Sequence, residues 1–549
     1  NLVVQSSGEA IHLNWVDNNK NSSGSKVYRS SNGGTPTLVA TLDPGVTDWK
    51  DEAVDTSSEY SYHIEVFNAE HSAKSSVSAP LKPSKSIISV IDSFKQSSDV
   101  ADPEGYAEIS AFDPLTNRIF VSNGEKKRVD VFNFSRDGKI SFSHSLSLPS
   151  GFGGINSVAV SNGMLAVAAE ADVKQDKGSA LLYSSDAKAG DAPFATIEVG
   201  SLPDHLIFTP DGLMLLVANE GEPNDAYTVD PHGSISIINV KDASLLKSNP
   251  SANVTLTAKT LDFTKYNSKK DELSAEGVRI FGNDGKATVA EDLEPEYIAV
   301  SPDGKQAVVT LQENNAVAIV DLEILEIVDV APLGFKDWAA LGLTMDATDK
   351  DEAYNPFLWP VFGMYQPDAI ASFAVGGKTY YITANEGDAR EYYVDANDND
   401  EYDAGEAGYV EEVRVDDLTL EFGLSGLYEF SIEYPAPHKA IQDKLNLGRL
   451  KTTTANGDID GDGKHEVIYS YGGRSFSIWD ENGTQVYDSG NMIEHIVRNH
   501  LSDYGSSYTE KRSDDKGPEP EGVTIGVVDG KTYAFVGLER SDAILVFDV

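Results

Sequence analysis

A pair of apolar runs joined by a tight turn recurs along most of the chain, and this repeat constrains the fold more than any other feature. Seven such hairpins align, beginning at Ala107, Ile155, Pro203, Pro295, Pro367, Gly448 and Pro520. Five carry an Asx-Gly or Gly-Gly turn, which strongly favours two antiparallel strands. Another apolar run follows each hairpin, as in "SISIINV" at Ser234.

Three or four strands that recur in this way are typical of the blades of a β-propeller. The sequence therefore predicts an all-β chain with a seven-bladed β-propeller over residues 83–549. Residues 86–94, "SIISVIDSF", are expected to supply the outer strand of the last blade. Two stretches, about 241–293 and 323–364, are too long for tight loops, and inserts of that length are usually functional or face a partner.

The first 82 residues have a different pattern. "IHLNWVD" and "KVYRSS" alternate apolar and polar residues, and "YSYHIEVFNAE" follows a turn. Short strands with turn signals between them predict a β-sandwich over residues 1–82. This segment resembles a fibronectin type III module, with Trp15, Tyr28, Tyr60 and Tyr62 in the place of its core aromatics.

One turn, in "NGDIDGDGKHE", carries an array of acids at alternate positions. It occupies the place of the "SPDG" turn in the hairpin at Pro295, so we expect an enlarged hairpin turn. Hard oxygen ligands from one short loop suit Ca²⁺. The predicted ligands are the side chains of Asp458, Asp460, Asp462 and Glu466 and the carbonyl of Lys464. The loop is not an EF-hand, because its twelfth position is Tyr469. The alternative is a solvated acidic turn, in which the three aspartates would repel one another.

A second acidic stretch, "DANDNDEYDAGEAG", begins at Asp395 and lacks the central glycine. It is interpreted either as a second calcium loop or as a disordered acidic tip. Its candidate ligands are Asp395, Asn397, Asn399 and Asp403.

Aligned hairpins also place acids at matching positions. Just before the first apolar pair stand Glu108, Asn156, Asp204, Glu296, Asp368 and Glu521. At the end of the second run stand Glu125, Glu170, Glu220, Glu313, Glu386 and Glu539, with Arg474 in the sixth hairpin. We expect both sets to crowd one mouth of the ring, where a divalent ion or a cationic ligand would relieve their repulsion. Alternatively Arg390, Arg474 and Arg540 pair with them, or the acids only cap and bridge blades.

Composition narrows the classes of partner. The chain has 88 acidic and 43 basic residues, a net charge of −45, and no cysteine. Such a charge repels nucleic acid and anionic membranes. A secreted protein without disulfides depends on a large core or on metal. No apolar run is long enough to span a bilayer. The acidic charge suits a salty medium, divalent cations or both, and we expect an extracellular or bacterial cell-surface location.

Several long motifs carry a resemblance to a known family. "WPVFGMYQPDAIASF" (359–373), "DGDGKHEVIYSYGGRSFSIWD" (460–480) and "SDDKGPEPEGVTIGVVDGKTYAFVGLER" (513–540) are similar to the choice-of-anchor I family. The resemblance covers about residues 86–549. It implies a secreted or surface bacterial propeller; some members carry alkaline-phosphatase labels, and the fold is distantly similar to phytase-like propellers that use calcium.

Two functions follow from these observations. The first is a calcium-binding extracellular module for adhesion or surface structure, whose partner is a protein, a glycan, another surface component or a copy of itself. The G-x-S-x-G, H-E-x-x-H and P-loop signatures are missing, which favours this view. The second is a calcium-dependent phosphoesterase, in which the carboxylates hold the metal and the arginines clamp phosphate. Its candidate residues are Glu296, Asp368, Glu386, Glu521, Arg390 and Arg474.

Overall fold

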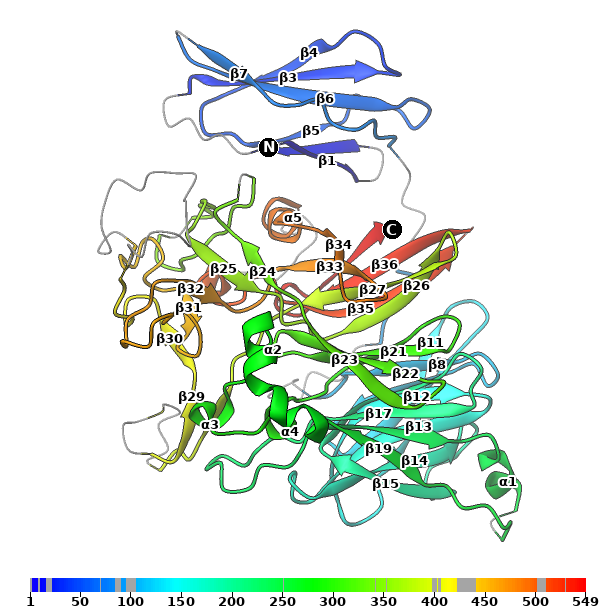
Figure 1. The fold of residues 1–549 in the computed structure, drawn as a ribbon. Helices are drawn as coiled ribbons and strands as arrows, with labels where there is room; N and C mark the ends of the chain where they lie inside the picture. Colours follow the sequence, from blue (N-terminus) through cyan, green and yellow to red (C-terminus); the bar gives the residue numbers. More distant parts are fainter. Residues whose placement is uncertain are drawn as a thin grey trace.

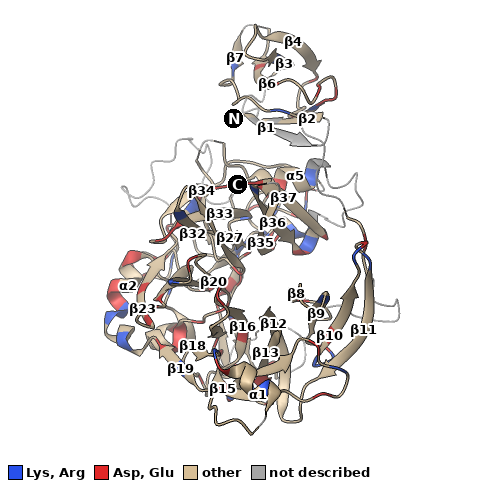
Figure 2. Cartoon of the chain, turned by 90° about the vertical axis from the view of Figure 1, so that its right-hand side faces the viewer, with Lys and Arg blue, Asp and Glu red and all other residues tan. Residues whose placement is uncertain are grey.

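Six antiparallel sheets follow one another around a common centre in the computed structural model (Figure 1, Figure 2). The structure describes residues 2–7, 10–15, 22–69, 71–83, 90–94, 105–249, 251–340, 342–351, 353–396, 402, 406–421, 441–500, 510–528 and 530–549. Strands dominate these residues, and the few helices are short, so the predicted all-β class is confirmed.

The N-terminal strands form two sheets that share one core. The first contains β1 (Leu2–Ser7), β2 (Ala10–Trp15) and β5 (Asp48–Asp51). The second contains β4 (Thr37–Leu42), β3 (Gly24–Ser31), β6 (Tyr60–Phe67) and β7 (Ser72–Lys74). Trp15, Tyr60 and Tyr62 lie in the shared core, which fits the expected fibronectin type III-like module. Tyr28 is a correction: its ring is half-buried and stacks on His63, with ring centroids 4.7 Å apart.

Five of the six sheets around the centre have four strands in meander order, and we call all six the ring sheets, numbered along the chain. Ring sheet one contains β8 (Ser110–Asp113), β9 (Arg118–Asn123), β10 (Arg128–Phe134) and β11 (Ile140–Ser147). Ring sheet two contains β12 (Phe152–Ser161), β13 (Met164–Ala171), β14 (Lys177–Ser184) and β15 (Ala195–Ser201). Ring sheet three contains β16 (Pro203–Phe208), β17 (Met214–Asn219), β18 (Ser234–Asn239) and β19 (Ala258–Asp262).

The other three ring sheets follow in the second half of the chain. Ring sheet four contains β20 (Ile298–Val300), β21 (Gln306–Leu311), β22 (Ala316–Asp321) and β23 (Glu326–Pro332). Ring sheet five contains β26 (Ile370–Val375), β27 (Lys378–Asn385), β33 (Ser475–Asp480) and β34 (Gln485–Asp488). Ring sheet six contains β35 (Pro520–Val528), β36 (Lys531–Leu538) and β37 (Ala543–Asp548).

Turn chemistry explains why the hairpins form where the sequence predicts them. Between β20 and β21, Gly304 has φ +73°, a conformation that favours glycine, and its N–H donates to the Ser301 carbonyl over 2.8 Å. Apolar side chains from each ring sheet then pack against the next, so a buried cluster lies between every successive pair from sheet one to sheet six. These clusters hold the inner strands side by side around the centre.

Seven blades are not confirmed, and the sixth predicted hairpin is wrong. The strands at its two ends, β31 (Lys451–Thr453) and β32 (Ile468–Ser470), do not pair with each other. β31 pairs with β30 (Glu412–Arg414), whereas β32 runs parallel to β25 (Val361–Met364). The run "SFSIWD" that follows is β33, the third strand of ring sheet five. Residues 386–474 are therefore one long insertion between two neighbouring strands of that sheet.

A second core forms beside the ring sheets. Within the described residues, parts of 335–364 and 408–470 fold together, and we call them the satellite. It contains β24 (Phe335–Asp337), β25, β29 (Gly408–Val410), β30, β31 and β32. β28 (Glu391–Tyr393), which precedes the second range, pairs with β29. Trp338, Trp359, Val415, Leu450 and Ile468 are buried in its core.

Each of the two predicted inserts contains a strand that belongs to a ring sheet. Residues 241–293 include β19, the outer strand of ring sheet three, and residues 323–364 include β23, the outer strand of ring sheet four. The helical segments are α1 (Ala243–Ser248), η1 (Thr264–Lys269), α2 (Lys270–Glu276), α3 (Gly282–Gly285), α4 (Val289–Asp292), α5 (Met492–His500), η3 (Glu510–Arg512) and η4 (Glu539–Ser541).

The expected outer strand at residues 86–94 is wrong for its described part. Residues 90–94 are not a strand, and they lie against ring sheet one instead of sheet six. Asp92 Oδ2 accepts a hydrogen bond from the Ile140 N–H over 2.9 Å, and the rings of Phe94 and Phe132 meet edge to face, 4.9 Å apart. Residues 86–89 lie outside the described residues.

Candidate functional site

The acids at the starts of the first strands lie at irregular points of those strands. The pairing of β16 with β17 shifts register between Pro203 and Leu206, the interval that contains Asp204. β35 shifts between Pro520 and Val523, around Glu521, and β12 shifts between Ile155 and Val158. A bulge of this kind re-aims the side chain that it carries. Three ring sheets therefore depart from regular pairing at the same position, where the sequence places an acid or an amide.

These carboxylates come together from different ring sheets, and we call Asp204, Glu220, Glu296, Glu313 and Asp368 the central carboxylates. Burial, followed by the charges of Glu313, Asp368, Glu220 and Asp204, raises the pKa of Glu296 well above its ordinary value. Burial and then the charges of Glu386, Glu521 and Asp204 do the same to the pKa of Asp368. Burial and the charge of Glu108 raise the pKa of Asp204. The structure thus brings together acids that are far apart in sequence.

The second predicted set stands where the inner hairpins end. Four acids come one or two residues after the second strand of their hairpin: Glu220 after β17, Glu313 after β21, Glu386 after β27 and Glu539 after β36. Glu170 lies near the end of β13. Glu125 differs, because it is exposed and pairs with the neighbouring Lys126 over 3.0 Å. Arg474 also differs, because it precedes β33 and does not end a second strand.

Two of the central carboxylates are buried without compensation. Glu296 and Glu313 are 9 % and 6 % exposed, and Oε2 of each has no hydrogen-bond partner among the described residues. Burial is the largest cause of the raised pKa of Glu313 as well. An unpaired buried carboxylate is costly when charged, so each of these groups calls for a proton or a cation.

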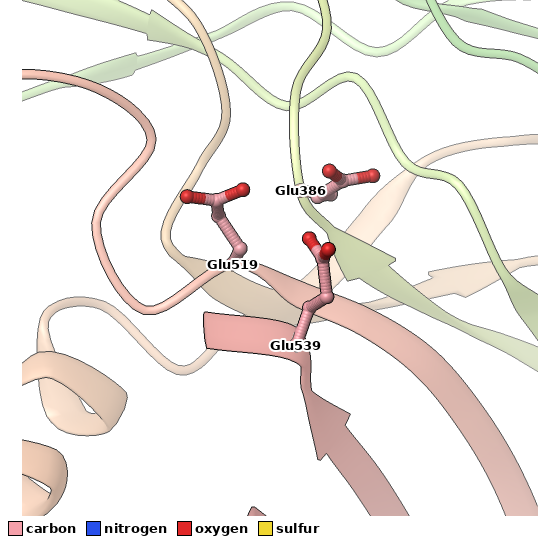
Figure 3. A group of neighbouring side chains, drawn as sticks. All are labelled: Glu386, Glu519 and Glu539. Carbon is pink, nitrogen blue, oxygen red and sulfur yellow. The ribbon is translucent and has the colours of Figure 1, made fainter. Parts of the chain in front are cut away.

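A neighbouring group of acids is compensated. The carboxyl groups of Glu386, Glu519 and Glu539 point toward one another, each with an oxygen within 4.8 Å of the others (Figure 3). Lys516 Nζ lies 2.7 Å from Glu386 Oε1, and Arg540 Nη1 lies 2.9 Å from Glu539 Oε1. Arg512 Nε donates to Glu519 Oε1 over 2.7 Å. Each acid of this triad therefore has a basic partner, although burial still raises the pKa of Glu386 and of Glu539 to about 7.

The predicted arginine clamps are engaged elsewhere, which corrects their assignment. Arg390 is buried and pairs with Asp292, and its Nη2 lies 2.9 Å from Glu294 Oε2. Arg474 is buried too; its terminal nitrogens donate to the carbonyls of Asp346, Ser513 and Asp515 and to Glu494 Oε1. Both guanidinium groups hold the fold together and leave no terminal nitrogen for a phosphate at the ring.

The acidic loop lies on the satellite, between β31 and β32, and not in a hairpin turn. Asp458, Asp460 and Asp462 each bring one oxygen to within 4.8 Å of the others. Two oxygens that both lie about 2.4 Å from one ion are at most about 4.8 Å apart, so this spacing fits Ca²⁺. Asp458 accepts from the N–H groups of Gly461, Asp462 and Gly463, which folds the loop around that carboxylate.

The other predicted ligands lie at the edge of the loop. Glu466 Oε2 accepts from the Ile459 N–H over 2.8 Å. The Lys464 ammonium binds Asp462 Oδ2 at 2.7 Å and also pairs with Glu421. Of the second predicted loop, only Asp395 is described; Asn397, Asn399 and Asp403 lie outside the described residues.

Sequence reasoning missed Glu294, Glu519 and Lys516. A signal was present, because "LEPEY" at Leu293 and "PEPEG" at Pro518 repeat the same acid-proline-acid order, and only the second acid of each was aligned. In the structure the first acid of each pair is the one that binds arginine: Glu294 binds Arg390, and Glu519 binds Arg512 and Arg540.

Known proteins resemble the chain to different degrees. Residues 108–549 match the family model of the Choice-of-anchor I domain. A mesenchyme-specific cell surface glycoprotein from Strongylocentrotus purpuratus is 26% identical over 338 residues, which cover 55% of this chain and 41% of that protein. Gigasin-3a from Magallana gigas is 33% identical over 119 residues, which cover 20% of this chain and 42% of that protein. The chain thus spans about two fifths of the length of these curated relatives.

Solved structures add little. A crystallised protein from Lactobacillus plantarum is 13% identical, with a TM-score of 0.30, and the match covers 74% of this chain and 94% of that one. A likeness this weak assigns neither fold nor function. No helix within the described ranges has the length and apolar character needed to cross a bilayer.

Proposed function

Since this chain belongs to the choice-of-anchor I family, we propose that it is a calcium-binding module of the cell surface or extracellular space that binds a partner. The relative from Strongylocentrotus purpuratus is a cell surface glycoprotein, which supports the location. The net charge of −45 fits a medium rich in divalent cations and a partner other than nucleic acid. A platform of sheets with an added sandwich and an added satellite suits display and binding.

The observation that carries the proposal is the spacing of Asp458, Asp460 and Asp462. All three offer hard carboxylate oxygens, and Ca²⁺ prefers such ligands from a flexible loop. The loop residues would hold the ion, with Glu466 and the Lys464 carbonyl completing the shell. Bound Ca²⁺ would offset much of the negative charge of the loop and stabilise the satellite on which it lies.

Calcium titration tests this proposal. Protein freed of metal by a chelator is titrated with Ca²⁺ in a calorimeter, and its melting temperature is measured with and without the ion. Because Ca²⁺ binds the folded form, a concentration of 100 times Kd adds about 2.7 kcal/mol. We expect Asp460→Asn with Asp462→Asn to remove this site, while the exposed control Glu481→Gln keeps it. Identical melting curves in Ca²⁺ and in EDTA would refute the proposal.

One observation favours a second function, the calcium-dependent phosphoesterase. Glu296, Asp368, Glu386 and Glu521 gather at the centre of the ring sheets, where a metal could activate water. The engaged state of Arg390 and Arg474 weakens this candidate, because it removes both intended phosphate clamps. Turnover of p-nitrophenyl phosphate, its bis ester or phytate that requires Ca²⁺ and disappears in Glu296→Gln would establish it.

A further inference from the structure

Within the part of the chain that the structure describes, the central carboxylates have no basic partner, in contrast to the neighbouring acids Glu294, Glu386 and Glu519. Among the described residues, no lysine, arginine or histidine lies within 4.0 Å of the carboxylate oxygens of Asp204, Glu220, Glu296, Glu313 or Asp368 as an ion pair. The basic side chains nearby are taken by other acids: Arg390 by Glu294, Lys516 by Glu386, and Lys174 by Glu222 at 3.7 Å.

The carboxylate oxygens without hydrogen-bond donors are the positions at which a ligand would add the most stabilisation. Oε2 of Glu296 and Oε2 of Glu313 are buried with no donor among the described residues, although buried carboxylates are normally hydrogen-bonded. A donor that arrives with a positive charge would satisfy both the missing hydrogen bonds and the missing charge.

The central carboxylates and the acids next to them differ in how exposed they are to solvent. Glu108 and Glu521 are exposed, Asp204 and Asp368 are half-buried, and Glu296 is buried. A ligand that approaches from solvent therefore meets acids at every depth. Such a gradient attracts a cation and then removes water from it, which strengthens each interaction at the inner end.

Spacing argues against a bare metal ion as the occupant. Within the described ranges, the groups of three or more carboxylates with oxygens within 4.8 Å of one another are the Glu386 triad and the acidic loop. No three of the central carboxylates meet this limit, so one ion could not touch three of them directly. A ligand with several N–H donors can span the wider separation.

Aromatic side chains lie among these acids. The Tyr392 hydroxyl donates to Glu222 Oε1 over 3.2 Å. Burial and then the charges of Glu294, Glu222, Glu313 and Glu220 raise the pKa of Tyr392, so these acids lie close enough to act on its hydroxyl. Tyr297 follows Glu296 directly and stacks on His205, with ring centroids 3.7 Å apart. Carboxylates combined with aromatic rings are typical of sites for alkylammonium and guanidinium groups.

We propose that the central carboxylates bind an alkylammonium or guanidinium group, held between Glu296 and Glu313 and flanked by Asp204, Glu220, Asp368 and Tyr392. This rests on the proposed function as a binding module and names the chemistry that its partner presents, either a lysine or arginine side chain or a free polyamine. It does not depend on the calcium loop, which lies on the satellite.

The experiment uses the full chain in saturating Ca²⁺ and follows binding by calorimetry. One arm titrates spermidine; the other titrates a short neutral peptide with a central lysine, with norleucine at that position as the control. We expect binding in at least one arm, and the stronger arm identifies the source. Glu296→Gln with Glu313→Gln should weaken it at least 10-fold. Glu326→Gln, at an exposed position on β23 of the same ring sheet, should have no effect.

Other outcomes overturn the proposal. No binding in either arm, or equal binding by the double variant, refutes it. A Ca²⁺ stoichiometry that falls by one in the double variant, with Ca²⁺ displacing the amine, would show a metal site instead. If the double variant does not fold, Glu220→Gln alone provides the same test. Asp460→Asn should leave amine binding unchanged, so failure of the calcium proposal and failure of this one are distinguishable.

Discussion

Replacing Glu313 by glutamine should stabilise the protein at neutral pH. The substitution keeps the shape of the side chain and removes a charge that the fold buries without a partner. Burial raises the pKa of Glu313 from the ordinary value of 4.5 to about 7. Because the folded form holds this proton more tightly than the unfolded form, the group favours folding at low pH. Its contribution is fully present below about pH 4.5 and is lost as the pH rises through about 7.

The magnitude follows from the two pKa values. They differ by about 2.5, and each unit corresponds to about 1.4 kcal/mol, so the ceiling is about 3 kcal/mol at pH 7.5. Neighbouring acids relax when one of them loses its charge, which lowers the gain in Glu313→Gln to about 1–3 kcal/mol. In a domain of this size, that is a rise in Tm of roughly 1–3 °C.

The assay is thermal unfolding in EDTA, without amine ligands, at pH 7.5 and at pH 4.5. Glu313→Gln should melt higher than the wild type at pH 7.5 and within about one degree of it at pH 4.5, where both side chains are nearly uncharged in the folded form. The matched control, Glu326→Gln, changes an exposed acid at the edge of the same sheet and should change neither value. A variant that melts lower than the wild type at pH 7.5 would refute the reasoning, because it would mean that the Glu313 carboxylate is favourably paired.

Two further predictions concern the parts that hold the ring and the insertion together. Arg390→Met leaves Asp292 and Glu294 buried without their shared partner. It should lower the free energy of unfolding, measured by chemical denaturation, by about 3–5 kcal/mol. Arg540 is more exposed, so Arg540→Met should lower it by less than about 1 kcal/mol. A small effect of Arg390→Met would mean that those acids find other donors. Gly387→Ala combines φ +94° with a new Cβ only 2.2 Å from the Gly472 nitrogen, so it should destabilise by more than about 2 kcal/mol. The control is Gly376→Ala: Gly376 has φ +60° and open space where the Cβ would lie, so only the backbone strain of the turn applies, about 1 kcal/mol. Equal losses of stability in the two variants would mean that the contact of Gly387 with Gly472 is unimportant.

Local signals predicted most of the ring. Six of the seven hairpins pair as their alternating runs and Asx-Gly turns indicate. Several of the acids aligned by position in those hairpins lie close enough to raise one another's pKa. This succeeded because hairpin pairing is short-range, and because a residue at a fixed place in each repeat must occupy a fixed place around the centre. The metal role of Asp458, Asp460 and Asp462 stays a prediction, supported by their spacing.

Non-local pairing explains what the sequence did not reveal. "GRLKTTT" and "EVIYSY" alternate like any hairpin, yet their strands bind β30 and β25, which lie far away in the chain. Nothing within the segment distinguishes these partners from each other. The engagement of Arg390 by Glu294 was hidden for the same reason, since 96 residues separate them. Tyr28 was assigned to the core from the resemblance to a fibronectin type III module, but Val27 is the buried residue of the two, and neighbouring residues of a strand point to opposite faces.

The long insertion in ring sheet five leaves and re-enters at one point. Asn385 and Ser475 are opposite each other in the β27–β33 pair. Just beyond them, the backbones at Gly387 and Gly472 lie so close that neither position has room for a Cβ atom. To the sheet, everything between those residues is equivalent to a single turn, and closing a longer loop adds only a logarithmic cost. The pairing of β27 with β33 therefore does not depend on the length of the segment between them, whereas the segment itself is fixed by partners outside it, such as Asp292 and Glu294 for Arg390 and β25 for β32.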